Sequence, residues 1–140
     1  MDFDRKELIR AAIEQQKKAY APYSGFYVGA AVMADSGKVY TGVNAENASY
    51  PAGICAERAA IFHAVSCGER RFEAIAIVGG MGGVNTACCQ PCGICRQVMR
   101  EFCDPEKMRV LMAKSPEEYR EMTLDELLPE SFGPEDLPER

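Results

Sequence analysis

The stretches Cys55-Ala56-Glu57 and Pro91-Cys92-Gly93-Ile94-Cys95 organise this sequence, because together they hold three thiols and a carboxylate in two short motifs. A catalytic zinc site uses three protein ligands and leaves the fourth position open for water. A carboxylate beside that position can accept and return protons. The two stretches therefore contain the donors that a catalytic zinc site requires.

Both motifs are predicted to lie at the starts of helices. Residues 56–67 are rich in helix-forming residues, and Gly68 after them is typical of a helix end. Pro91 stands where a second helix, over residues 92–102, would begin. The partial positive charge and free N–H groups of a helix start stabilise thiolates. Two helix starts are therefore expected to bring the thiolates of Cys55, Cys92 and Cys95 to one metal ion.

The other segments alternate between helix and strand patterns. Apolar residues at helical spacing predict an amphipathic helix over residues 4–19, and a short helix is expected over 124–128. Strands are expected over 26–34, 38–43, 73–78 and 108–113. The glycine-rich stretch 79–83 lacks the spacings of phosphate-binding motifs and is interpreted as a flexible loop. The alternation predicts an α/β layered domain.

Composition limits the classes of function. The 140 residues suit a single domain, 1–140, and the net charge of −5 argues against a nucleic-acid partner. The longest near-apolar stretch, 74–84, is too short to span a membrane. The first residues lack the pattern of a signal peptide, which predicts a cytoplasmic protein, and the seven cysteines are interpreted as metal ligands or free thiols.

The order of the two motifs resembles the zinc-dependent nucleoside and nucleobase deaminases. A cysteine at the first ligand position is similar to the all-cysteine branch of small cytidine deaminases. Further matches cover nearly the whole chain: Ala21-Pro22-Tyr23-Ser24, Val28-Gly29-Ala30, Asn44-Ala45-Glu46-Asn47 and Leu127-Leu128-Pro129. The resemblance implies a three-layer α/β/α fold with a mixed five-stranded sheet. It also implies one Zn²⁺ per subunit and hydrolytic deamination of cytidine and deoxycytidine, in pyrimidine salvage, to uridine and deoxyuridine plus ammonia.

The resemblance assigns roles around the metal and the base. Glu57 is expected to carry protons as the catalytic residue. Arg58 is expected to hydrogen-bond the ligand sulfurs and so to offset the negative charge of three thiolates. Phe26 would pack beside the pyrimidine, although a core aromatic residue is an equal interpretation from the sequence alone. The backbone of Ala56 would contact the base.

The remaining implied roles concern the sugar and neighbouring subunits. Asn44 and Glu46 match positions that hydrogen-bond the ribose hydroxyls. Tyr50 and Phe132 match positions that complete neighbouring pockets in tetrameric members of the family. The expected partners are a small nucleoside and further copies of the chain in a homotetramer, without nucleic acid or membrane.

Alternatives remain open from the residues alone. Residues two apart on a regular helix point away from each other, so Glu57 can face the metal only if Cys55 lies outside regular helical geometry. The substrate could also be a related nucleoside, such as a nucleoside antibiotic, or a nucleotide or polynucleotide. In a different class, a fourth cysteine could close the site into a structural zinc module, and the candidates are Cys88, Cys89 and Cys103. His63 is interpreted as a helix or interface residue.

Overall fold

The computed structural model describes residues 2–138 and contains one mixed five-stranded sheet in the order β2-β1-β3-β4-β5. The strands are β1 (Phe26–Ala34), β2 (Val39–Val43), β3 (Phe72–Met81), β4 (Arg109–Ala113) and β5 (Tyr119–Thr123). The pair β3 and β4 is parallel, and the other neighbouring pairs are antiparallel. The helices are α1 (Arg5–Gln16), α2 (Ala56–Ser66), α3 (Gly93–Glu101) and α4 (Leu124–Leu127), with 3-10 turns η1 (Tyr50–Ala52) and η2 (Pro134–Asp136).

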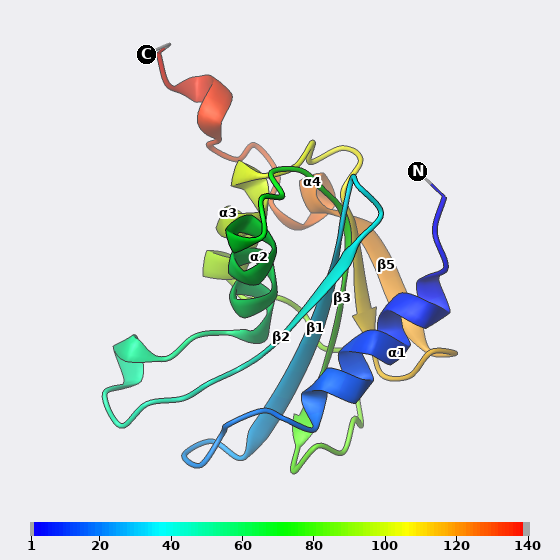
Figure 1. The fold of residues 1–140 in the computed structure, drawn as a ribbon, viewed down its shortest axis with the longest axis vertical. Coiled ribbons are helices and arrows are strands. Elements are labelled where there is room, and N and C mark those ends of the chain that lie inside the picture. The colour runs from blue at the N-terminus through cyan, green and yellow to red at the C-terminus, as the bar shows by residue number, and fades with distance from the viewer. Residues whose placement is uncertain (1, 139–140) are drawn as a thin grey trace.

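Helices cover both faces of the sheet, with α1 on one side and α2 and α3 on the other (Figure 1). The central strand β3 shows why, because its residues alternate between two apolar cores. Ala74, Ala76 and Val78 belong to the core that includes α1. Ile75 and Ile77 belong to the core that includes α2 and α3. A sheet buried on both faces confirms the expected three-layer α/β/α architecture.

The predicted helix ends are largely confirmed. The side chain of Asp4 caps α1 by accepting from the Glu7 N–H at 3.0 Å, and Gly68 follows α2 with a φ of +98°. The prediction that the first helix reaches residue 19 is wrong. The helix ends at Gln16, because the chain then tightens into a turn and the Tyr20 N–H donates to the Asn44 carbonyl at the end of β2.

Two predictions about strands need correction. Residues 79–81 form part of β3 and pair with β1, so the interpretation of 79–83 as a loop is wrong for its first half. Strand β5 is not among the four strands that the sequence patterns predict. It is an edge strand of mixed polar and apolar residues that are only partly buried, so it carries no clear alternation.

Among the helices of residues 2–138, none combines the length and the apolar character that a membrane span requires.

Candidate metal centre and cavity

Three cysteines converge where α2 and α3 begin. Cys55 and Cys92 immediately precede these helices and have extended backbones, with ψ angles of 154° and 166°. Neither side chain hydrogen-bonds to its own helix as a cap. Cys95 lies in the first turn of α3 and is fully buried. Cys55 therefore has the non-helical geometry that its spacing from Glu57 requires.

The three sulfurs have the separations expected around one zinc ion. The Cys55 and Cys92 Sγ atoms are 3.8 Å apart, the Cys92 and Cys95 Sγ atoms are 3.5 Å apart, and all three lie within 4.8 Å of one another. Zinc–sulfur bonds of about 2.3 Å in tetrahedral geometry place two sulfurs about 3.8 Å apart. In the described part of the chain this group has three members, and no fourth cysteine joins it. The donor set therefore fits zinc with one position left for another ligand.

Positive charge lies beside the sulfurs. The Arg58 Nη2 atom donates to Cys55 Sγ at 3.4 Å, and the Arg58 Nε is buried without a hydrogen-bond partner among residues 2–138. Hydrogen bonds from Cys95 and Arg58 lower the pKa of Cys55, whereas the bond to Cys55 and burial raise the pKa of Cys95. These contacts therefore favour the thiolate form of Cys55.

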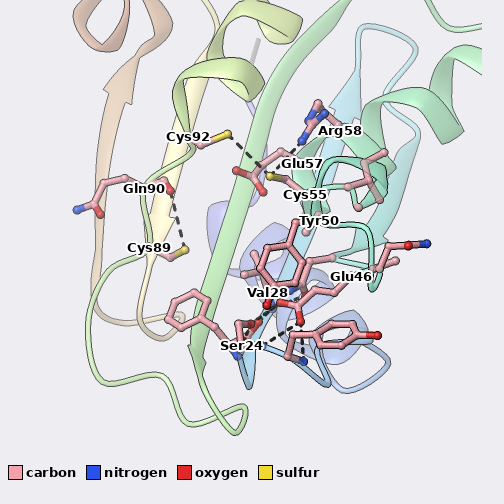
Figure 2. Close-up of a pocket in the computed structure, with 18 residues that line it drawn as sticks. Ser24, Val28, Glu46, Tyr50, Cys55, Glu57, Arg58, Cys89, Gln90 and Cys92 are labelled. Carbon is pink, nitrogen blue, oxygen red and sulfur yellow. Dashed lines mark hydrogen bonds between the residues drawn. The ribbon is translucent and has the colours of Figure 1, made fainter.

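Glu57 lies beside these sulfurs and is almost completely buried, with 4% of its surface exposed. In Figure 2 its carboxylate lies next to the Cys55 sulfur, near the line that joins Cys55 to Cys92. Burial raises the pKa of Glu57 to about 7. A carboxyl group that titrates near neutral pH can both accept and donate a proton there.

A cavity of about 500 Å³ opens next to the metal group. This volume is in the range of small-molecule sites. Of the site residues predicted from the sequence, nine line it: Phe26, Asn44, Glu46, Tyr50, Cys55, Ala56, Glu57, Arg58 and Cys92. Cys95 is buried behind the wall. Phe132 does not line the cavity of its own chain: its carbonyl accepts from the Gln97 side chain at 2.8 Å, and the residue is 59% exposed.

Figure 2 shows Glu46 at the opposite end of the cavity from Cys55 and Cys92, where the loop before β1 holds it. Its carboxylate accepts from the backbone N–H groups of Tyr23 and Ser24, both at 3.0 Å, and from the Ser24 hydroxyl. These hydrogen bonds, led by that of the Ser24 hydroxyl, hold the pKa of Glu46 below its usual value. An ionised acceptor therefore faces the cavity at neutral pH.

Asn44 connects the end of β2 to the start of β1. Its side-chain oxygen accepts from the Val28 N–H at 2.9 Å, and its side-chain nitrogen donates to the Phe26 carbonyl at 2.8 Å. Each end of the amide has capacity for one further hydrogen bond. The side chain is thus fixed in orientation and can still bind a ligand.

Among the cavity-lining residues that were not predicted as site residues from the sequence, two shape the cavity directly. Ser24 holds Glu46, and Cys89, considered only as a metal ligand, forms part of the wall. Burial raises the pKa of Cys89 to about 12, so this thiol is neutral. Glycine within a strand marks places where other groups approach the backbone closely, so Gly79 could have indicated a side chain above it.

Comparison with known proteins identifies the family. Residues 3–112 match the model of the cytidine and deoxycytidylate deaminase zinc-binding region. The chain belongs to this family.

Individual relatives cover nearly the full length of the chain. A cytidine deaminase of Sporosarcina psychrophila is 43% identical over 134 residues, which are 96% of this chain and 95% of the relative. One from Halalkalibacterium halodurans is 45% identical over 134 residues, 96% and 98% of the two chains. The crystal structure of cytidine deaminase from Burkholderia pseudomallei has a TM-score of 0.81 and 44% identity, covering 90% of this chain and 97% of that chain.

Membership of a zinc-binding deaminase family confirms the resemblance, the fold and zinc as the cofactor. Family membership and the donor group of three cysteines together count against the alternative of a closed structural module with four cysteines.

Proposed function

We propose that this chain hydrolyses cytidine and deoxycytidine to uridine and deoxyuridine with release of ammonia, as an enzyme of pyrimidine salvage in the cytoplasm. The observation that carries the proposal is a cavity at which the buried carboxyl group of Glu57 meets a cluster of three cysteine sulfurs. Relatives named cytidine deaminase, aligned over 96% of the chain, support the substrate class.

Cys55, Cys92 and Cys95 would hold the zinc ion. Bound there, zinc would supply the Lewis acidity that makes water a nucleophile at neutral pH. Three thiolates weaken this effect by adding negative charge. The Arg58 guanidinium and the starts of α2 and α3 offset that charge, because each places positive charge or N–H donors beside the sulfurs.

Glu57 would move the protons that the reaction requires. Its carboxylate accepts a proton from the attacking water and delivers it to ring N3 as the new C4–O bond forms. It then passes the second water proton to the amino group, which leaves as ammonia when the C4–N bond breaks. Its buried position suits both steps, since a pKa near 7 makes the two protonation states nearly equal in free energy.

The rest of the cavity would bind and orient the nucleoside. Ala56 opens α2, and the backbone N–H groups of a first helical turn have no partner within the helix, so the Ala56 N–H can donate to the base. Phe26 offers an aromatic ring for the flat pyrimidine. Asn44 and the ionised Glu46 would bind the ribose hydroxyls, and a site built around such bonds rejects ligands that lack them.

Tyr50 and Phe132 would complete the cavities of neighbouring copies in a homotetramer. Tyr50 and Phe132 are 75% and 59% exposed, so both are accessible to a neighbouring copy. Tyr50 lines the cavity mouth of its own chain, so a neighbour that covers it would also close the cavity.

Substrate class can be tested by measuring ammonia release from cytidine, deoxycytidine and deoxycytidine monophosphate. We expect turnover of both nucleosides and rejection of the nucleotide, because a phosphate near Glu46 would meet a negative charge. A cytosine-containing nucleoside antibiotic serves as the comparison for the related-nucleoside alternative. Turnover of the antibiotic or the nucleotide, with neither nucleoside accepted, would contradict the proposal.

A further inference from the structure

The loop between β3 and α3 contributes a cavity side chain that the proposed chemistry does not use. Cys89 lines the cavity, and its Sγ lies directly over Gly79 of β3. A Cβ atom placed on Gly79 would be only 2.8 Å from this sulfur and 2.9 Å from ring atom Cε2 of Phe26. Cys89 and Phe26 therefore occupy neighbouring places over the same stretch of backbone.

This loop is held on both sides of Cys89. On the N-terminal side, Gln16 and Asn85 exchange two side-chain hydrogen bonds of 2.6 and 3.0 Å, and Gln16 is only 4% exposed. On the C-terminal side, the Arg96 Nε donates to the Pro91 carbonyl at 2.8 Å. Hydrogen bonds on both sides of Cys89 therefore restrain the loop segment that carries it.

This inference rests on the proposed function. The chemistry of the proposed reaction determines how the base is oriented in the cavity. C4 must face the three sulfurs, and N3 must face Glu57, which delivers its proton. Glu57 and the Ala56 N–H both belong to α2, so the edge of the ring that carries N3 faces α2. The C5 edge then faces the opposite wall. Figure 2 shows Cys89 and Gln90 on that side, across the pocket from Glu57 and Arg58.

We propose that Cys89 determines the size of the substituent that the enzyme accepts at C5 of the pyrimidine. A thiol of intermediate size beside C5 leaves room for hydrogen and limits the space for a larger group. Replacing Cys89 with a smaller residue enlarges this space, and replacing it with a branched residue reduces it.

The test compares kcat/KM for 5-methylcytidine and for cytidine in the parent, Cys89→Ala and Cys89→Val proteins. A methyl group in an apolar pocket changes discrimination by roughly tenfold or more. The ratio of 5-methylcytidine to cytidine should therefore rise about tenfold in Cys89→Ala and fall about tenfold in Cys89→Val. The electronic effect of the methyl group cancels, because it is the same in every variant. Cys88→Ala is the matched control, since Cys88 is the adjacent half-buried thiol and lies outside the cavity lining.

Binding of uridine and 5-methyluridine, measured by calorimetry, gives the same comparison without the chemical step. The inference would be overturned if the ratio of the 5-methyl compound to the unsubstituted one were the same in the parent and both Cys89 variants. It would also be overturned if Cys88→Ala changed this ratio as much as the Cys89 variants do. A parent protein that converts cytidine with unchanged ratios in the variants overturns this inference alone. A parent that neither converts cytidine nor binds uridine overturns the proposed function as well.

Discussion

At the scale of single residues, the site depends on charges that are compensated locally. Three cysteine sulfurs and a buried carboxyl group lie within one small region, and Arg58 is in contact with this group through Cys55. The raised pKa of Arg58, caused mainly by its hydrogen bond to Cys55, shows that this contact favours the charged guanidinium. The guanidinium therefore stabilises the ligand set as a whole.

Removing Arg58 should weaken zinc binding. Groups that hydrogen-bond metal ligands typically contribute about 10–100-fold to metal affinity or activity. We therefore expect Arg58→Ala to bind zinc at least about tenfold more weakly than the parent, as measured by competition with a chelator. Arg70→Ala is the control, because Arg70 lies beyond the C-terminal end of α2 and donates to the backbone carbonyls of Val65 and Glu69. Equal zinc affinities for Arg58→Ala and the parent would refute the role.

Glu46 should contribute to substrate affinity through its ionised carboxylate. Glutamine cannot accept equally well from the two N–H groups and the hydroxyl that now hold Glu46, and it lacks the charge. Glu46→Gln is expected to lower kcat/KM for cytidine by about tenfold or more, mainly through KM. Glu69→Gln is a matched control, since Glu69 also accepts from a serine and a tyrosine hydroxyl but lies outside the cavity. Equal losses in both variants would indicate an effect on the fold instead.

At the scale of elements, sequence patterns predicted most helices and strands because their signals are local. Gly68 and Pro91 indicated the ends of helices, and the apolar run in β3 indicated a buried strand. The edge strand β5 was missed because its residues are half exposed, and its pairing with β4 is a tertiary contact.

In the candidate site too, local sequence predicts one part, and the other part depends on tertiary contacts. The metal group follows from spacing and helix starts. The cavity wall depends on which loop crosses β3, and that is why neither Cys89 nor the contact of Ser24 with Glu46 could be inferred from local sequence. The expected positions of Phe26, Asn44 and Glu46 came from family resemblance, because each is an ordinary residue for its segment.

The ion pairs of Glu121 on β5 with Arg5 on α1 and Arg109 on β4 should make a pH-dependent contribution to stability. Glu121 accepts from Arg5 at 2.5 and 3.0 Å and lies 3.7 Å from Arg109. The bond from Arg5 holds the pKa of Glu121 below 4.5, its usual value. A carboxyl group with a lowered folded-state pKa stabilises the fold above its unfolded-state pKa, and this contribution is lost as pH falls through the folded-state value.

Glu121→Gln should therefore lower the free energy of unfolding by up to about 1 kcal/mol at neutral pH. The difference from the parent should shrink below about pH 4.5, because the parent carboxylate also becomes neutral there. Denaturant unfolding of both proteins at several pH values measures it. Glu117→Gln, at an exposed position near β5, should show no such trend. A difference in unfolding free energy between the two proteins that grows as pH falls would contradict this role of Glu121.

At the scale of the whole molecule, Tyr50 lines the cavity and is largely exposed, and Phe132 lies outside the cavity lining. The proposed tetramer predicts a solution mass four times that of the 15.4 kDa chain, measured by analytical ultracentrifugation. Phe132→Ala should reduce activity without loss of zinc, because the aromatic ring would be supplied to a neighbouring copy. A fully active monomer would contradict the tetramer.

The central claim is that Glu57 moves protons in a zinc-dependent deamination. The most direct measurement is cytidine turnover, followed by pyrimidine absorbance and ammonia release, in parent and Glu57→Gln proteins of equal zinc content. Glutamine keeps the shape of the side chain but cannot accept the proton. We expect turnover in the parent and a loss of at least about 10²–10⁴-fold in the variant. Equal turnover in both proteins, or none in the zinc-loaded parent, would contradict it.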